Sequence, residues 1–516
     1  MSLVSDRGDH GRLAVAPLIA LAALALLVFA GRAHATELIY WDNYGDDPDT
    51  VGFANIDGSG GGALGLGSEV LIDPEGMAYD TVTNRLFATS DSEGSSSGKI
   101  VAINLDGSGA SSFTAPGAPI DNPEGIAVDP ATRTIYWLNT DSETIAWARL
   151  DGSAGGTLST TGATISGPCC RIAVDPVAGR VYWVNSTPSP NVISYAKTDN
   201  SGGGDLSYSG ASVEPSNEGL AVDPAAGRLY YIDGDEIGFA NLNGSGGGVV
   251  SNAGGVFNGP WGLAFDPSIG RFYWGNESNS ENEREDAIGF LNLAGGGGGI
   301  DISTAPVDNP QDPIVIKSPV GTGAPAITRN PKVPAELACS SASWGADYPG
   351  SFVYQAPRSL AYQWSVNGVV LGSGPERITA SKAGQYTCTV TAANQAGSTA
   401  QTSTVVKVNA TKVRLTTKKK AKAETGDLVK FKVKAVNRGD IATRSSAKLC
   451  GKLPKAARDD LKAPKCKKLG SLKGRAKKTL TIKVKVKPGA DLGTDKLTFK
   501  VKGAAGKAAK SKIVVK

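Results

Sequence analysis

The sequence is almost without histidine. Its 516 residues include two, His10 and His34, and both fall in an N-terminal stretch that we expect to be removed. Histidine titrates near neutral pH and is the commonest metal ligand, so its absence excludes Ser-His and Cys-His nucleophile pairs and every histidine-ligated metal centre. No CxxC pair occurs either, so a zinc site built on paired cysteines is not expected.

Long apolar runs are equally scarce. The one long run, residues 13–29, follows Arg7 and Arg12 and precedes the small-x-small sequence Ala33-His34-Ala35. This pattern predicts a secretory signal peptide over residues 1–35. We therefore expect a secreted, extracellular protein associated with the cell surface, and the membrane is a partner only if the alternative, an uncleaved anchor, holds.

Aromatic residues are also few, at 7% of the chain, whereas glycine occurs 66 times. This composition favours many short strands joined by tight turns over helical bundles. Six cysteines are present, and an even number in an exported chain favours disulfides over metal sites.

The near-neutral total charge hides a strong segregation along the chain. Residues 36–320 contain 37 Asp and Glu against 11 Lys and Arg, a balance of −26, whereas residues 411–516 contain 33 Lys and Arg against 7 Asp and Glu, a balance of +26. Residues 321–410 are nearly neutral, with 6 basic and 3 acidic residues. Such a distribution bears on binding partners rather than on fold.

A phrase such as GIAVDPATRTIYWLN recurs through residues 36–320. Each repeat offers four candidate strands, and its first strand ends on an aspartate; the five aspartates are Asp80, Asp129, Asp175, Asp223 and Asp266. Four strands in each 40–50 residues are typical of a propeller blade. The second strand occurs six times but the first only five, so we expect PIVIKS (313–318) to pair beside LIYWDN (38–43) and to close a ring of six blades.

These repeats resemble the YWTD (low-density-lipoprotein-receptor class B) family. They share its GLAVD-like start, its RLYW-like second strand and the turn seen as Asp106-Gly107-Ser108. Trp137 and Trp183 are followed by Leu-Asn and Val-Asn instead of Thr-Asp, which leaves the neighbouring NHL-type propellers as the alternative resemblance with the same blade count. The resemblance implies a propeller that binds proteins, while a minority of similar propellers are metal-dependent enzymes.

The residue five before each repeat aspartate is expected near the ring axis. These residues are Glu75, Glu124, Cys170, Glu218 and Trp261, with Gln311 in the sixth blade. Glu75, Glu124 and Glu218 supply the oxygen ligands that Ca²⁺ prefers, and no other cofactor is expected. The alternative is that each glutamate only accepts hydrogen bonds from nearby backbone N–H groups.

The third blade departs from the repeat at the same place. Cys169 and Cys170 are adjacent, and Arg171 stands where the other repeats have glycine. We expect a Cys169–Cys170 disulfide at the channel rim, with Arg171 beside it among the ligand-binding residues. The bond has either a ligand-contact or redox role or a purely structural one.

Two further β-sandwich modules follow the propeller. In residues 321–410, Cys339, Trp364 and Cys388 form the Cys…Trp…Cys pattern of an immunoglobulin-like sandwich, with Tyr386 at its tyrosine-corner position. The Cys339-to-Trp364 separation of 25 residues is long and predicts an insertion. A Cys339–Cys388 disulfide is expected.

Residues 411–516 alternate apolar residues with lysine, as in LVKFKVKAVN. This pattern predicts strands with one buried face and one lysine-covered face, and Cys450 and Cys466 are expected to form a disulfide. The segment resembles CARDB/DUF11-type adhesion modules of bacterial envelope proteins. Its lysines either bind an anionic envelope polymer or only prevent edge strands from pairing; sequence-specific nucleic-acid binding is not expected, because aromatic residues to stack bases are few.

The sequence therefore predicts an all-β, non-enzymatic surface binding and adhesion protein. An acidic six-bladed propeller presents a face to a protein or other surface ligand, and a basic C-terminal module attaches to an anionic envelope or matrix polymer. The alternative is a metal-assisted hydrolase or lactonase acting at the propeller's central channel.

Overall fold

The structure is a computed structural model that describes residues 37–44, 49–91, 98–187, 189–211, 214–216, 218–277 and 287–516. The predicted signal peptide lies outside the described residues. Within these ranges the protein is built from β-strands, and the one helical element is the 3₁₀ turn η1 (Ala456–Arg458). None of the described helices is long and apolar enough to cross a membrane.

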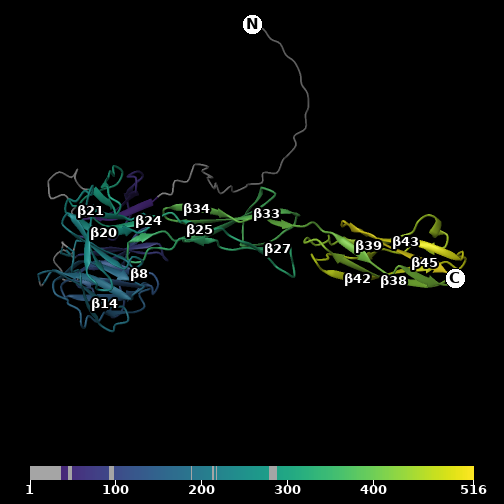
Figure 1. Ribbon diagram of the computed structural model, residues 1–516, viewed down its shortest axis with the longest axis horizontal. Helices are drawn as coiled ribbons and strands as arrows, with labels where there is room; N and C mark the ends of the chain where they lie inside the picture. The colour runs from purple at the N-terminus through teal and green to yellow at the C-terminus, as the bar shows by residue number, and fades with distance from the viewer. Residues whose placement is uncertain are drawn as a thin grey trace, which may run out of the picture. The chain divides into compact units, whose positions relative to one another are not determined.

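Five successive four-stranded antiparallel sheets form five blades (Figure 1). Blade one contains β4 (Met77–Asp80), β5 (Arg85–Ser90), β6 (Lys99–Asn104) and β7 (Ala110–Phe113), and blade two contains β8 (Pro123–Asp129), β9 (Thr134–Asn139), β10 (Thr144–Arg149) and β11 (Gly155–Thr157). Blade three contains β12 (Pro168–Asp175), β13 (Arg180–Asn185), β14 (Val192–Lys197) and β15 (Gly203–Leu206), and blade four contains β16 (Leu220–Asp223), β17 (Arg228–Asp233), β18 (Glu236–Asn241) and β19 (Gly247–Val250). Blade five contains β20 (Pro260–Asp266), β21 (Arg271–Asn276), β22 (Ala287–Asn292) and β23 (Gly297–Ile300). Each blade follows the repeated phrase, whose first strand becomes the innermost strand of the sheet.

The sixth blade combines the two ends of the repeat region. It contains β24 (Pro310–Lys317), β1 (Glu37–Asn43), β2 (Val51–Asn55) and β3 (Gly62–Ala63) in that order. Strands β1 and β24 are antiparallel, with Ile39 opposite Val315, and β24 packs against both β20 and β4. The predicted closure by PIVIKS and the six-bladed propeller are confirmed.

A buried Trp-x-Asn pair explains the departure from the YWTD signature. In blade two the indole N–H of Trp137 donates to Oδ1 of Asn139 (3.1 Å), which also accepts from the backbone N–H of Asp121 (3.0 Å). The Asn139 amide donates to the carbonyl of Pro119 (3.2 Å). Asparagine both accepts and donates here, so it fastens the loop from the preceding blade to the second strand; Asn43, Asn185 and Asn276 accept from their own tryptophans in the same way.

The second module contains two facing sheets. Strands β26 (Ile327–Arg329), β27 (Glu336–Cys339) and β32 (Arg377–Thr379) form one; β30 (Ser359–Val366), β31 (Val369–Gly374), β33 (Gly384–Asn394), β34 (Gly397–Thr402) and β35 (Val406–Val408) form the other, and β25 (Gly321–Gly323) pairs with β28 (Ser343–Trp344). The predicted Cys339–Cys388 disulfide joins the two sheets beside buried Trp364. The hydroxyl of Tyr386 donates to the carbonyl of Lys382 (2.8 Å), as a tyrosine corner requires.

The third module is a sandwich of two five-stranded sheets. The first has the order β40 (Leu461–Lys462), β42 (Lys477–Val486), β38 (Leu428–Asn437), β36 (Val413–Thr416) and β44 (Gly506–Lys507). The second has the order β37 (Lys420–Ala423), β45 (Ala509–Val515), β43 (Gly493–Lys502), β39 (Lys448–Lys452) and β41 (Lys467–Lys468). The predicted Cys450–Cys466 and Cys169–Cys170 disulfides are also present.

We predict that Asn139→Ala lowers the free energy of unfolding by about 2 kcal/mol, because it removes several buried hydrogen bonds at once. Urea unfolding of the full chain measures the loss. Asn243→Ala, at an exposed turn where the Asn243 side chain accepts one bond from Ser245 N–H, is the control and should change stability by a few tenths of that amount. Equal effects of the two substitutions would contradict the role assigned to Asn139.

Candidate functional site in the propeller channel

The six innermost strands line a central channel, and the repeat places equivalent residues at equal depth. We call the end at which these strands begin the front mouth and the other end the back mouth. The predicted rim residues form the first layer at the front mouth. The next residue of each strand belongs to the second layer, which has glycine in four blades, and the residue after it belongs to the third layer, which is apolar. The second layer contains Gly76, Gly125, Arg171, Gly219, Gly262 and Asp312, and the third contains Met77, Ile126, Ile172, Leu220, Leu263 and Pro313.

Arg171 and Asp312 are the two exceptions to glycine in the second layer, and they belong to opposite blades, three and six. Nε of Arg171 lies 2.7 Å from Oδ1 of Asp312, in ion-pair contact without hydrogen-bond alignment. The guanidinium also donates to the carbonyls of Glu75 (2.6 Å) and Cys170 (2.8 Å) and to Oε1 of Gln311 (2.8 Å). Arg171 is only 5% exposed, so a buried ion pair spans the channel below the front mouth.

The other predicted rim residues divide into two groups. Gln311 accepts from Arg171, and Trp261 lies with its ring centroid 5.4 Å from the guanidinium carbon, so both adjoin the ion pair. Glu124 accepts from the backbone N–H of Cys170 (2.7 Å). Glu218 instead accepts from Gly234 of its own blade (3.2 Å). Glu124 and Glu218 thus both bond backbone N–H groups, as the alternative interpretation of the sequence expected.

Three carboxyl groups near Arg171 are held in an environment that disfavours charge. Burial, reinforced by the nearby Glu124 carboxylate, raises the pKa of Glu75 to about 7. Burial is also the main cause that raises the pKa values of Asp42 and Asp312; the charge of Asp312 adds to it at Asp42, and Arg171 opposes it at both. Asp42 is fully buried, and among the described residues neither of its carboxyl oxygens has a hydrogen-bond partner.

The calcium site at Glu75, Glu124 and Glu218 stays a prediction. Among the described residues, the group of three potential ligand atoms that lie within 4.8 Å of one another is Glu124 with Cys169 and Cys170, whose sulfurs are joined in a disulfide. The Arg171 guanidinium is already a cation in the channel directly below the front mouth. This arrangement weighs against a metal-assisted hydrolase at this place.

The back mouth is closed by the insertion that the long Cys339-to-Trp364 separation predicted. We call residues 347–358 of this insertion the plug. Its strand β29 (Val353–Tyr354) pairs in parallel with β24 as a fifth strand of blade six. The plug carbonyls of Gly350, Ser351 and Phe352 accept from the backbone N–H groups of Val222 (2.9 Å), Phe265 (2.9 Å) and Val315 (3.0 Å), which belong to blades four, five and six.

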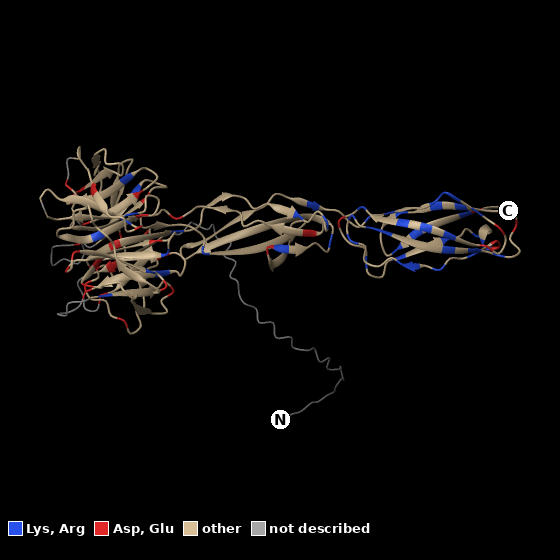
Figure 2. Cartoon of the chain, turned by 90° about the horizontal axis from the view of Figure 1, so that it is seen from below, with Lys and Arg blue, Asp and Glu red and all other residues tan. Residues whose placement is uncertain are grey.

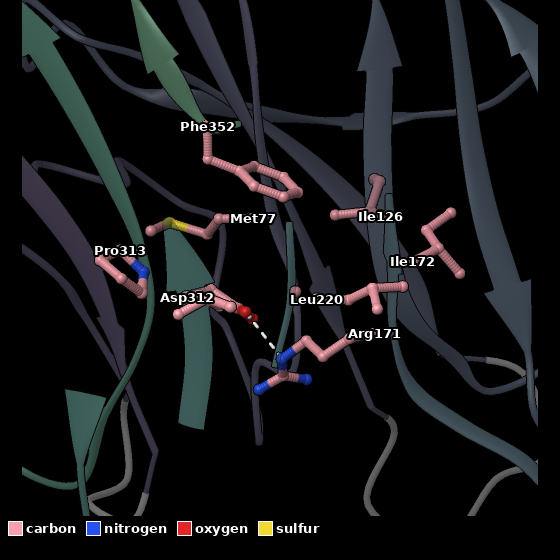
Figure 3. A pocket seen from close by; sticks show the side chains of 10 residues that line it. Met77, Ile126, Arg171, Ile172, Leu220, Asp312, Pro313 and Phe352 are labelled. Carbon is pink, nitrogen blue, oxygen red and sulfur yellow. Dashed lines mark ion pairs between the residues drawn. The ribbon is translucent and has the colours of Figure 1, made fainter. Parts of the chain in front are cut away.

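Phe352 extends from the plug into the channel against the apolar layer (Figure 3). The cavity that remains between Phe352, the apolar layer and the Arg171–Asp312 pair is about 10 Å³, at the lower limit for one water molecule. Tyr354 packs edge-on to Tyr79 with ring centroids 4.9 Å apart. The channel is therefore filled from both ends, and a ligand meets only the shallow surface of the front mouth.

Sequence reasoning missed Asp42, Asp312 and Phe352. Asp312 occupies the glycine position of the sixth repeat, so aligning that position in all six blades would have placed it opposite Arg171. Asp42 follows Trp41 where the other repeats have Thr, Leu, Val, Ile or Gly, which marks it as unusual without naming its neighbours. For Phe352 the sequence showed that an insertion exists but not where it goes.

No family model matches the sequence, and no curated protein matches it. Among solved structures, the protein is similar to a chain from a structure described as "Crystal structure of Nidogen/Laminin Complex", with 19% identity and a TM-score of 0.42 over 54% of this chain and 98% of that chain. The assignment of the propeller rests on the six sheets and their closure.

We predict that Glu75→Gln stabilises the protein at pH 8 but not at pH 4.5. The folded state raises the pKa of Glu75 to about 7, so the native protein loses stability relative to the unfolded chain as the pH rises from about 4.5 through 7. Glutamine carries no such penalty, so the gain at pH 8 is on the order of 3 kcal/mol. Urea unfolding at both pH values, with exposed Glu214→Gln as the control, measures it; a difference independent of pH would argue against this environment for Glu75.

We predict that Phe352→Ala and Gly350→Val in the full chain loosen the propeller itself. The first removes the aromatic ring from the channel, at a cost of about 2–4 kcal/mol. The second places a side chain at φ 77°, where a Cβ meets the carbonyl oxygen of Val174 at 2.5 Å. Hydrogen exchange read by mass spectrometry should become faster at Val222, Phe265 and Val315.

Val369→Ala, at a 65% exposed position of the same module, is the matched control for the plug variants and should leave propeller exchange unchanged. Propeller exchange that stays the same in both plug variants would show that the plug does not support the ring.

Proposed function

We propose that the protein is an extracellular binding protein that uses two surfaces. The front mouth of the propeller presents a binding face to a protein or other surface ligand, and the lysine-rich third module attaches the protein to an anionic polymer of an envelope or matrix. The three disulfides support an oxidising location outside the cytosol. The observation that carries the proposal is the placement of the lysines within the third module.

Exposed lysines cover the interior strands of both sheets in the third module (Figure 2). On β43, Lys496, Lys500 and Lys502 are exposed to solvent, whereas Leu497 and Phe499 of the same strand are buried. This strand has β45 on one side and β39 on the other. Lysines that only prevent unwanted strand pairing belong on edge strands, so that explanation does not account for a row on an interior strand.

Several of these lysines lie directly opposite one another on neighbouring strands. Lys496 is paired with Lys512 and Lys502 with Lys448. Like charges at directly opposed positions destabilise a sheet. An arrangement that costs stability and does not protect an edge supports an external anionic partner as its purpose.

The propeller offers a ligand the surface of its front mouth and not an open channel. Arg171 and the plug fill the channel, so a ligand of the propeller contacts the front mouth, where the partly exposed residues Trp261 and Glu75 adjoin the Arg171 guanidinium. A protein surface suits such a shallow site better than a small molecule does, because small-molecule sites are concave cavities that bury most of the ligand.

We predict that the full chain binds a polymer of glycerol phosphate with steep salt dependence. Each ammonium group that neutralises a phosphate releases counterions, so the dissociation constant should rise by at least a hundredfold between 50 mM and 500 mM NaCl. Isothermal titration calorimetry or interferometry on immobilised polymer measures it, with uncharged dextran as the control ligand. Binding that is absent, or that is unchanged over this range of salt, would rule out attachment through the lysines.

A further inference from the structure

The lysines of the third module are not equivalent, because one part of the second sheet is hollowed. A groove of about 940 Å³ lies over β43, β45 and the end of β39. Its basic lining residues are Lys419, Lys452, Lys496, Lys500, Lys510 and Lys512, and no acidic residue lines it. We call these six residues and the space between them the lysine groove.

We propose that the lysine groove is the binding site for a linear phosphodiester polymer with a polyol backbone, and that the lysines on the outer face of the first sheet are dispensable for that binding. This inference rests on the proposed function of the third module and adds to it the place of binding and the chemical class of the ligand.

The sheet geometry places the ammonium groups of the groove close enough together for one polymer to contact several of them. Lysines at alternate positions of a strand, such as Lys510 and Lys512, have Cα atoms about 7 Å apart. Lys496 lies opposite Lys512 on the neighbouring strand, at a Cβ separation of about 5 Å. A hollow lined by charge of one sign also concentrates the electrostatic field more than an exposed face does. A flexible chain with one negative charge in each repeat unit can meet several of these groups at once.

The chemistry of the lining favours phosphodiesters over other anions. All six basic residues are lysines, whose ammonium groups bind phosphate as point charges, without the planar fork through which arginine binds carboxylate and phosphate groups bidentately. Aromatic residues are absent from the lining, so single-stranded nucleic acid finds no platform for its bases. Between the charges, Pro454, Ala508 and the aliphatic lysine stems suit short carbon linkers, and the hydroxyl of Thr498 is a donor for phosphate oxygens.

Two variants of the full chain with equal charge change test the proposal. The groove variant carries Gln in place of Lys496, Lys500, Lys510 and Lys512; the face variant carries Gln in place of Lys430, Lys432, Lys483 and Lys485, all exposed on the outer face of the first sheet. Binding of poly(glycerol phosphate) at 100 mM NaCl should weaken at least 30-fold in the groove variant and less than threefold in the face variant. The slope of log K against log salt should fall by about 3 in the groove variant only.

Lysine acetylation of the wild-type chain gives a readout that does not depend on the folding of any variant. Saturating poly(glycerol phosphate) should protect Lys496, Lys500, Lys510 and Lys512 from acetylation and leave Lys430 and Lys483 reactive, as read by mass spectrometry.

Both variants remove opposed lysine pairs, so their thermal unfolding midpoints should equal or exceed that of the wild-type chain.

The outcomes separate the groove from the wider function. Equal weakening in the two variants, or equal protection of both lysine sets, overturns the groove while leaving polymer attachment in place. No binding by the wild-type chain overturns the proposed function itself. Tighter binding of polyglutamate or of a single-stranded oligonucleotide of equal charge overturns the ligand class, and so does a groove variant that loses only self-association in sedimentation experiments.

Discussion

Pairing between β1 and β24 is the interaction on which the rest of the propeller depends. Each blade buries its apolar faces only against its neighbours, so a ring left open would expose two faces to water. The sixth blade brings Ile39 and Trp41 from one end of the repeat region into one buried cluster with Val315 from the other end and Tyr273 from blade five. Once this pair forms, all six inner strands face a common axis, and the depth of every channel residue follows from its place in the repeat.

Closing the ring creates a second requirement. The inner edges of the six innermost strands then face the axis, and their backbone N–H and C=O groups need hydrogen-bond partners. The two ends of the channel meet it differently. At the front, Arg171 and Asp312 replace two glycines and extend across the axis. At the back, the plug supplies carbonyl groups to three blades. The candidate binding face is shallow for this reason, and its acidic residues sit in surroundings that resist their ionisation.

The repeat made the architecture predictable, because segments that share one residue pattern fold into the same four-stranded blade. Closure by residues 313–318 and the convergence of Glu75, Glu124, Arg171 and Gln311 follow from the register of the repeats, whereas the disulfides follow from the number and placement of the cysteines. Two kinds of feature did not follow. Asp42 and Asp312 are single departures from the repeat, and their partners depend on three-dimensional distance. The plug belongs to the second module in sequence but fills the channel of the propeller. Likewise, alternation predicted exposed lysines, but only the sheet order shows that they occupy interior strands.

The plug also joins the chemistry of the second module to the interior of the first. Residues 347–358 lie between Cys339 and Cys388, which are 49 positions apart in sequence and covalently bonded. The segment that fills the back mouth is thus part of a closed covalent loop, tethered at both ends to one sandwich. Such a bond acts mainly by restricting the unfolded chain, so it favours the folded sandwich from which Phe352 extends into the channel. A disulfide of one module thereby helps to keep its neighbour's channel filled, although neither of its cysteines lies within the ring.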